Sequence, residues 1–383
     1  MKNFKYRNPV KILFGEGMIK EINKEIAQEE RILLIYGGGS IFKNGVYKQV
    51  IEALEGCQLF EFGGIEPNPH YETCVKAVEF IHKESITFVL AVGGGSVIDA
   101  TKFIVAAACY KGDAWDLMLG NAPIKAALPF GTVLTLPATG SEMNSGFVIT
   151  KHATQEKLAM GSPLCFPQFS VLDPLTTLSL PAMQTANGII DAFVHVTEQY
   201  VTCPQDAPLQ DRFAESILQV LVEEGKKVMA NPNNLAARAN IMWAATWALN
   251  NWIGQGVDDD WATHMIGHEL TAFHGIDHGQ TLAIVLPGLL DVMRSYKKAK
   301  IIQMGERVFH IHANNGQEAI NQTIEAIEKF FNSLGIKTRL SDYNVTETVI
   351  PKIVQRFQER GWLLGEEEQI TPEIVAEILR RRL

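Results

Sequence analysis

Histidines and an aspartate at helical spacing in the second half of the chain could together bind a metal ion. Asp191 and His195 are four residues apart, so on a helix their carboxylate and imidazole would lie on one face. His264 and His268 repeat this spacing. Mixed imidazole and carboxylate ligands suit Zn(II), Fe(II) and other first-row divalent ions. The sequence therefore predicts a metal site on predominantly apolar helices.

Two more histidines, His274 and His278, follow in the same stretch. They flank Gly275, and we expect both to lie beyond the end of the helix that carries His264. The zincin pattern H-E-x-x-H is absent, because the His-Glu pair at 268–269 is followed by Leu-Thr-Ala. Spacing alone does not separate metal ligands from histidines that support them, so the ligand set stays open at this point.

Two Gly-Gly-Gly-Ser loops, at Gly37–Ser40 and Gly93–Ser96, could bind a phosphate. Each follows a predicted strand and precedes a predicted helix, where free backbone N–H groups and the helix dipole favour an anion. Neither loop completes G-x-G-x-x-G, since Phe42 and Ile98 stand where the third glycine would be. Neither continues into the G-K-[ST] of a P-loop. Two such loops at corresponding places in one sheet predict a phosphate-bearing ligand.

The first of these loops favours NADP(H) over NAD(H). A dinucleotide site usually has an Asp or Glu after a strand to bind the 2′-hydroxyl of the adenosine ribose. Here Tyr36 is followed by three glycines and Ser40, and Lys43 comes shortly after. Small residues, a hydroxyl and a nearby cation suit a 2′-phosphate.

The segment 135–144 is a third turn-rich stretch with small hydroxyl residues, although such clusters usually only make turns.

The elements that must position these residues change in kind near the middle of the chain. Apolar runs first alternate with helical patterns, which predicts a parallel, doubly wound sheet. The expected strands are Arg31–Tyr36, Leu59–Phe62, Thr87–Val92 and Thr132–Leu136. From Pro181, which suits the first position of a helix, the patterns are almost all helical. The expected helices there are Thr185–Val201, Asp211–Met229, Ala236–Asn250, Trp261–Phe273, Thr281–Tyr296, Gln317–Leu334 and Pro372–Arg382.

We therefore expect an α/β domain with a parallel sheet at 1–180 and an all-α domain at 181–383, with the active site in the cleft between them.

Hydrophobic residues make up 46% of the 383 residues, which argues against disorder. The formal charge of −9 argues against a nucleic-acid or anionic-membrane partner. Five scattered cysteines, none in C-x-x-C spacing, argue against a thiolate zinc site or a disulfide framework. Without an apolar signal or membrane span, we expect a soluble cytoplasmic protein.

Together these motifs resemble the iron-containing (group III) alcohol dehydrogenase family along essentially the whole chain. The motifs that carry the resemblance are Asp191-x-x-x-His195, the spacing of His264 and His278, and Gly93-Gly-Gly-Ser-x-x-Asp99-x-x-Lys102. Within the family the chain is most similar to the NADPH-dependent aldehyde reductase and butanol dehydrogenase branch. The stretches that carry this finer similarity are 62–69, 90–96 and 261–270.

The resemblance implies which residues would form the site. The metal ligands would be Asp191, His195, His264 and His278. His268 would be a non-ligating catalytic residue near the nicotinamide. The cofactor residues would be Gly37, Gly38, Gly39, Ser40, Gly94, Gly95, Ser96, Asp99, Thr135, Thr139, Ser141, Asn144 and Lys157. Gly38 and Ser40 would meet the 2′-phosphate, and family members that use NAD tend to carry Asp near position 38.

The resemblance also implies an activity, which is reversible hydride transfer between NADP(H) and an aldehyde or primary alcohol. One divalent ion, Zn or Fe, would act as a Lewis acid, and Lys2–Arg7 would be an edge strand of a homodimer. A polyol dehydrogenase, a dehydroquinate-synthase-like lyase, a metal-dependent hydrolase or phosphotransferase and a non-enzymatic sensor stay open as alternatives. A lyase acting on an anionic substrate would need several Lys or Arg near the metal. The segments around Asp191 and His264 contain almost none.

Overall fold

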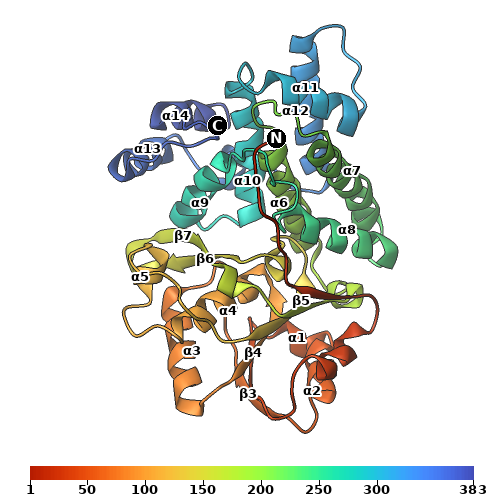
Figure 1. The fold of residues 1–383 in the computed structure, drawn as a ribbon. Helices are drawn as coiled ribbons and strands as arrows, with labels where there is room; N and C mark the ends of the chain where they lie inside the picture. Colours follow the sequence, from red (N-terminus) through yellow and green to blue (C-terminus); the bar gives the residue numbers. More distant parts are fainter. The chain divides into compact units, whose positions relative to one another are not determined.

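The structure is a computed structural model that describes residues 1–383, and the chain divides into two compact units (Figure 1). An α/β unit comprises Arg7–Leu180, and a helical unit comprises Pro181–Leu383 together with Met1–Tyr6. The first six residues thus belong with the helical unit and not with the α/β domain expected at 1–180. Lys2–Arg7 have no regular secondary structure in the single chain. The expected edge strand would pair with a second copy of the chain, so it stays a prediction.

A six-stranded sheet forms the centre of the α/β unit, and its strands follow the order β1-β8-β5-β4-β2-β3. Every neighbouring pair is parallel, which confirms the expected sheet. The strands are β1 (Lys11–Phe14), β2 (Arg31–Tyr36), β3 (Gln58–Phe62), β4 (Phe88–Gly94), β5 (Phe130–Leu136) and β8 (Phe169–Leu172). The four strands expected from the sequence are β2, β3, β4 and β5. The outer pair formed by β1 and β8 was not expected.

Helices cover both faces of this sheet, with α3 and α4 on one side and α1 and α2 on the other (Figure 1). Ile32 and Leu34 of β2 share a buried cluster with Ile22 and Val50. Leu33 and Ile35 are buried on the opposite face, so the strand is apolar along its length. The helices are η1 (Met18–Lys24), α1 (Ser40–Lys43), α2 (Val46–Ala53), α3 (Tyr71–Glu84), α4 (Gly95–Ala107) and α5 (Trp115–Met118). Four short 3₁₀ turns follow at Ser141–Met143, His152–Thr154, Pro163–Cys165 and Pro174–Thr177.

An antiparallel hairpin, β6 (Gly146–Lys151) with β7 (Glu156–Gly161), is a second small sheet that the sequence analysis missed. Its connection contains no glycine, and Gln155 instead adopts a left-handed φ of 52°. The usual Asn-Gly signal of a hairpin is therefore absent. The hairpin carries Lys157, one of the cofactor residues that the resemblance implies.

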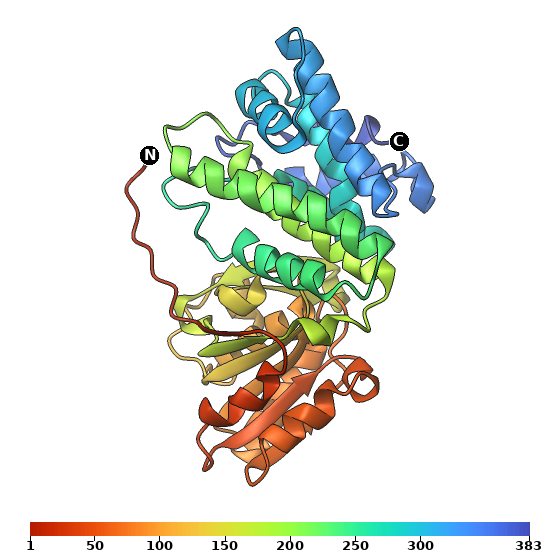
Figure 2. The same cartoon turned by 90° about the vertical axis from the view of Figure 1, so that its right-hand side faces the viewer.

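The second unit is helical, as expected, and its long helices run beside one another (Figure 2). They are α6 (Ala182–Tyr200), α7 (Pro208–Ala230), α8 (Leu235–Ala248), α9 (Ala262–His274), α10 (His278–Val292), α11 (Lys298–Phe309), α12 (Gly316–Ser333), α13 (Val349–Arg360) and α14 (Pro372–Arg380), with one 3₁₀ turn at Ser341–Tyr343. Helix α7 lies against both α6 and α8. None of these helices is long and apolar enough to cross a membrane.

Several boundaries in the helical unit differ from the expected ones. Pro181 is the residue before α6 and not its first helical residue. His274 is the last residue of α9 and not beyond its end, whereas His278 does lie beyond α9, as the first residue of α10. Helices α11 and α13 were not expected at all. The turn between α9 and α10 is only three residues long because Gly275 adopts a left-handed φ of 68° that ends α9.

Candidate metal and cofactor sites

Helix α6 brings three polar side chains onto one buried face. Asp191, His195 and Glu198 are separated by four and then three residues, so they form one stripe along the helix. Asp191 is only 4% exposed and Glu198 only 3%. Buried charges persist only where partners compensate for lost hydration. The stripe therefore has to be matched by groups on neighbouring helices.

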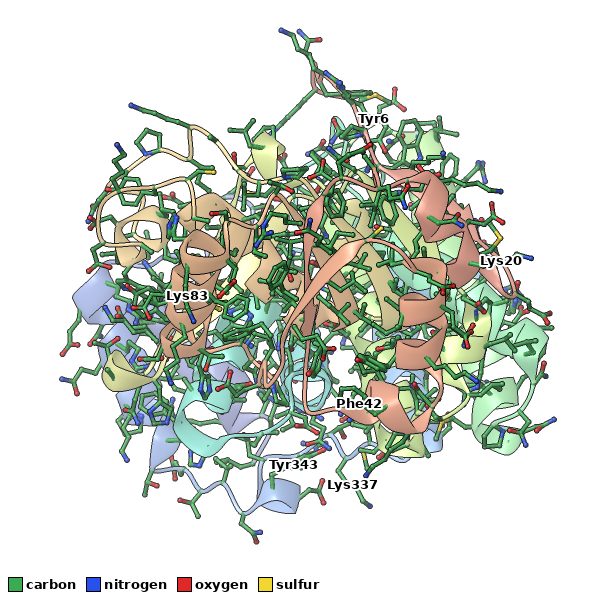
Figure 3. The ribbon with its side chains drawn as sticks, turned by 90° about the horizontal axis from the view of Figure 1, so that it is seen from below. Tyr6, Lys20, Phe42, Lys83, Lys337 and Tyr343 are labelled. Carbon is green, nitrogen blue, oxygen red and sulfur yellow. The ribbon has the colours of Figure 1, made fainter.

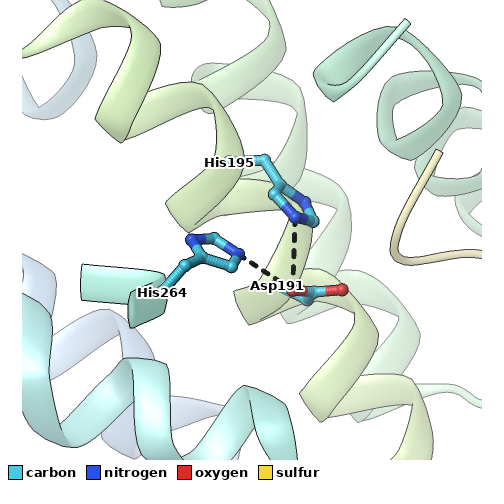
Figure 4. Close-up of side chains that lie close together, drawn as sticks. All are labelled: Asp191, His195 and His264. Atoms are coloured by element: carbon cyan, nitrogen blue, oxygen red, sulfur yellow. Dashed lines mark ion pairs between the residues drawn. The ribbon is translucent and has the colours of Figure 1, made fainter. Parts of the chain in front are cut away.

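The carboxylate of Asp191 faces imidazoles from its own helix and from α9 (Figure 4). Its Oδ1 atom is 3.7 Å from Nε2 of His195 and 3.7 Å from Nε2 of His264. Nε2 of His278, on α10, lies 3.6 Å from the same oxygen. Hydrogen bonds are shorter than this. Two ligands that are each about 2.1 Å from a tetrahedral ion lie about 3.4 Å apart, so the spacing is that of ligands sharing a metal.

Two of these buried atoms lack any hydrogen-bond partner in the protein. They are Oδ1 of Asp191 and Nε2 of His264. An unpaired buried polar atom costs free energy that a bound cation would recover. The ligand atoms of Asp191, His195 and His264 all lie within 4.8 Å of one another, and His278 meets the carboxylate from outside this tight group. The residues present therefore fit a divalent ion.

His268 and His274, the other two histidines of the stretch 264–278, differ in their distance from this group of ligand candidates. The ring centroid of His268 lies 5.1 Å from that of His278 and 6.3 Å from that of His264, so His268 borders the group. His274 is exposed at the end of α9. The rings of His195 and His264 stack at 4.5 Å with an interplanar angle of 18°. The structure thus brings together all five predicted residues, His268 included, and leaves His274 apart.

Two glycines allow the helices to approach closely enough for this arrangement. A Cβ atom on Gly279 would lie 2.6 Å from the backbone oxygen of Asn187 in α6. A Cβ on Gly267 of α9 would lie 2.9 Å from Oγ1 of Thr281 in α10. Since His278 immediately precedes Gly279, this close contact places its ring beside the carboxylate on α6. Neither glycine was predicted from the sequence.

Burial and neighbouring charges shift the pKa values of Asp191, His195 and His264. Burial would raise the pKa of Asp191, but the facing imidazoles, that of His195 above all, hold it below its usual range. Burial lowers the pKa of His195 to about 4. Burial also acts to lower the pKa of His264, but the carboxylates of Glu198 and Asp191 outweigh it and raise the value to about 9. Without metal, Asp191 is therefore ionised and His195 neutral near pH 7.

In the α/β unit the two glycine loops lie at the same edge of the sheet, because β2 and β4 are adjacent parallel strands. A Cβ on Gly37 would be 3.6 Å from Cγ2 of Val97, so the first loop contacts the beginning of α4. Ser40 is the first residue of α1 and Gly95 the first residue of α4. Backbone N–H groups at both helix starts are thus available for anions.

The glycines of the loops have different reasons to be glycine. A Cβ on Gly95 would lie 2.5 Å from Oγ1 of Thr139, so packing excludes any side chain there. Gly39 has a left-handed φ of 88° and lies beside the ring of Phe42, which is 50% exposed (Figure 3). A Cβ on Gly38 would have no neighbouring atom within 4 Å, and this residue has no left-handed φ. Packing therefore does not impose glycine at position 38.

A buried polar network supports the second loop. Ser141 Oγ donates to Asp99 Oδ1 at 2.6 Å and accepts from Lys102 Nζ at 2.8 Å. The same ammonium group donates to Asn144 Oδ1 and to the backbone oxygen of Gly146, each at 2.8 Å. Burial lowers the pKa of Lys102 to about 8, against the opposing charge of Asp99. Lys102 therefore holds Ser141 and Asn144 in place, a role that the sequence analysis did not assign.

A second group of contacts joins the hairpin to the same loop. Lys157 Nζ donates to Asn68 Oδ1 at 2.9 Å, and the N–H of Asn68 donates to Ser96 Oγ at 3.3 Å. Asn68 has a left-handed φ of 55°, which Asn tolerates better than most residues. Thr135 is buried near the end of β5, ahead of the turn that carries Thr139. Asn68 was missed, although its position between two prolines marks an unusual turn.

Comparison with known proteins identifies relatives along the whole chain. A family model described as iron-containing alcohol dehydrogenase matches residues 9–174. A second, the C-terminal part of the Fe-containing alcohol dehydrogenase family, matches residues 185–383. NADPH-dependent aldehyde reductase YqhD of Escherichia coli (strain K12) is 52% identical over 378 residues, which cover 98% of each chain. Probable NADH-dependent butanol dehydrogenase 1 of Bacillus subtilis (strain 168) is 42% identical over 100% of each chain.

Solved structures show the same similarity in three dimensions. The substrate- and cofactor-free form of the aldehyde reductase YqhD from E. coli has a TM-score of 0.94 at 49% identity and covers 100% of both chains. NADH-dependent butanol dehydrogenase A from Thermotoga maritima has a TM-score of 0.96 at 37% identity, covering 100% of this chain and 99% of that one.

Proposed function

Because the chain belongs to the iron-containing alcohol dehydrogenase family, we propose that it is a metal-dependent enzyme that transfers hydride between NADP(H) and an aldehyde or primary alcohol. The observation that carries this proposal is the unpaired carboxylate oxygen of Asp191 among three imidazole nitrogens. The relatives at 52% and 42% identity, an NADPH-dependent aldehyde reductase and a probable NADH-dependent butanol dehydrogenase, support the reaction class.

The proposed metal ligands are Asp191, His195, His264 and His278. When bound, Zn(II) or Fe(II) would supply a Lewis acid that polarises the substrate oxygen. Three neutral imidazoles and one carboxylate leave the centre with a net positive charge, which suits a developing negative charge on that oxygen. Both metals accept this donor set.

His268 is proposed to handle the proton. It borders the ligand group, with its ring centroid 5.1 Å from that of His278 and 6.3 Å from that of His264. An imidazole can pass a proton to the substrate oxygen directly, through water or through a ribose hydroxyl. It would do so during reduction of the aldehyde and accept the proton during oxidation of the alcohol.

The glycine loops are proposed to hold NADP(H), which supplies the hydride when bound. Gly94, Gly95 and Ser96 would meet the pyrophosphate at the start of α4. Gly37–Ser40 would take the 2′-phosphate, where the open space around Gly38 leaves room for it. Hydrogen bonds connect Ser141 to Asp99, Asn144 to Lys102, and Lys157 to Asn68, close to the second loop. The remaining proposed cofactor residues are Asp99, Thr135, Thr139, Ser141, Asn144 and Lys157.

The experiment that tests this function follows the absorbance of reduced nicotinamide with purified protein and butanal. NADPH and NADH are run side by side, with a chelator-treated control reloaded with Zn(II) or Fe(II). We expect NADPH consumption that chelation abolishes and metal restores. Preference for NADH would overturn the assignment of Gly37–Ser40 alone. Absence of turnover with either cofactor, in protein shown to contain metal, would overturn the proposed reaction.

A further inference from the structure

The buried carboxylate of Glu198 is not among the proposed ligands, yet it accepts hydrogen bonds from the beginning of α9. Its Oε1 accepts the backbone N–H of Thr263 at 2.6 Å and that of His264 at 3.3 Å. Its Oε2 contacts Nδ1 of His264. Its backbone oxygen accepts the N–H of Asp260 at 3.0 Å. One residue of α6 is thus bonded to three residues at the start of α9.

We propose that Glu198 is a positioning residue that fixes the ring of His264 for metal binding. The proposal rests on the assignment of His264 as a ligand in the proposed function. An ionised carboxylate can only accept a hydrogen bond, so Nδ1 of His264 has to be the donor. That leaves Nε2 as the nitrogen that faces Asp191 at 3.7 Å. A carboxylate on the far nitrogen of a ligating histidine sets the ring orientation and raises its basicity.

The backbone at this point needs such support. Trp261, directly before α9, has a left-handed φ of 59°, which a bulky residue rarely adopts. The first N–H groups of any helix have no partner within that helix. Here Asp260 Oδ1 accepts the N–H of Ala262 at 2.7 Å, and Glu198 accepts the next two. Glu198 therefore holds both the helix start and the ring of His264.

A buried ion cluster fixes the same junction from its other side. Lys297 Nζ lies 2.6 Å from Asp260 Oδ2 and 2.9 Å from Glu366 Oε2, and it donates to the backbone oxygen of Val201 at 2.9 Å. Lys297 is only 1% exposed, so its charge depends on these partners. Val201 directly follows α6, and Asp260 lies just before α9. The two helix ends that Glu198 joins are thus already held in register.

The test is the affinity of metal-free protein for Zn(II), measured by competition with a chromophoric chelator in the absence of cofactor and substrate. The variant is Glu198→Gln, which keeps the shape of the side chain. Its single oxygen cannot accept from both the helix start and the ring, and its amide would present a donor to one of them. We expect the Kd for Zn(II) to rise about 10–100-fold.

Glu269→Gln is the matched control, because Glu269 is a buried carboxylate on α9, the helix of His264, and pairs with Arg356 and Arg360 instead of a histidine. We expect it to leave the Kd for Zn(II) unchanged. If Glu198→Gln fails to fold by circular dichroism, Glu198→Asp replaces it, since the shorter carboxylate cannot reach both sets of donors, and the Kd should rise about tenfold.

The proposal is overturned if a folded Glu198 variant binds Zn(II) as tightly as the unsubstituted protein, or if Glu269→Gln weakens binding equally. Failure of the proposed function would look different. In that case the Zn-loaded, unsubstituted protein would consume no NADPH, while the difference in Zn(II) affinity between the two glutamate variants would persist.

Discussion

The metal-binding group and the glycine loops are built in opposite ways. In the first, side chains from α6, α9 and α10 surround Asp191 Oδ1, a buried atom that no group in the protein satisfies. In the second, Gly37–Ser40 and Gly93–Ser96 offer backbone from which side chains are missing. The metal-binding group depends on side-chain atoms that can act as ligands, whereas the glycine loops depend on the space that missing side chains leave for a phosphate. Removing atoms should therefore damage the first region, and adding atoms should damage the second.

The largest expected effect tests the first half of this comparison. His264→Ala removes one proposed ligand from a group whose other members are fixed by packing. We expect loss of bound metal and a fall in kcat/KM of about 10³-fold or more, since Lewis-acid stabilisation is worth several kcal/mol. Metal content by mass spectrometry and NADPH consumption with butanal measure the two effects. Full metal content together with full turnover would contradict the assignment.

The pH dependence of metal affinity should be the next largest effect. In metal-free protein the pKa of His264 is raised to about 9, while His195, with a pKa of about 4, is already neutral at pH 7. Above pH 9 the ring of His264 is neutral and ready to bind, whereas below it one proton has to leave first. Affinity for Zn(II) should therefore fall about tenfold per pH unit, or about 100-fold from pH 9 to pH 7.

This prediction is checked by titration calorimetry in two buffers of different ionisation enthalpy, which counts protons released per metal. We expect at least one proton to be released per Zn(II) at pH 7, the proton of His264. A count near zero would mean that the carboxylates do not hold His264 charged in the metal-free protein.

Gly38→Asp tests the second half of the comparison by adding atoms where there is room for them. No atom lies within 4 Å of the new Cβ position, so we expect the fold to be unaffected. The added carboxylate would repel a 2′-phosphate, and the ratio of kcat/KM for NADPH to that for NADH should fall about 30-fold. Gly38→Asn, which has the same size without the charge, is the control. An unchanged ratio in both variants would place the 2′-phosphate elsewhere.

The smallest expected effect comes from adding one methyl group to the metal-binding region. A Cβ in Gly279→Ala would lie 2.6 Å from the backbone oxygen of Asn187, so the start of α10 and His278 with it must move. We expect the Kd for Zn(II) to rise about tenfold, in line with the 1–3 kcal/mol typical of overpacking. Gly225→Ala is the control, since its nearest contact would be an ordinary 3.4 Å from Ile189. Equal effects of the two variants would mean that α10 is not held by this contact.

What the sequence could predict follows a physical pattern. Strand β4 and the loop at Gly93–Ser96 were found because a continuous apolar run ending in glycines is a strong local signal. Strands β1 and β8 were missed because four residues carry too little pattern. The hairpin of β6 and β7 was missed because its turn uses Gln155 in place of glycine.

The same distinction holds at the site. The ligand candidates were visible as residue types at helical spacing, and Glu198 could have been found by extending that spacing by one turn from His195. The requirement for Gly279 was invisible, because it arises from the backbone of Asn187, more than ninety positions earlier. Close contacts between distant segments leave no trace in either local sequence.

The place of Met1–Tyr6 in the helical unit has a consequence for biosynthesis. These residues leave the ribosome before the α/β unit, but Lys2 N–H donates to the backbone oxygen of Gly256, far along the chain. The α/β unit, Arg7–Leu180, is continuous and can collapse as soon as it has emerged. The segment ahead of it has to wait for its partner until the chain as far as Gly256 has been translated. A bulky group attached to this segment would therefore hinder its pairing with the helical unit and not the folding of the α/β unit.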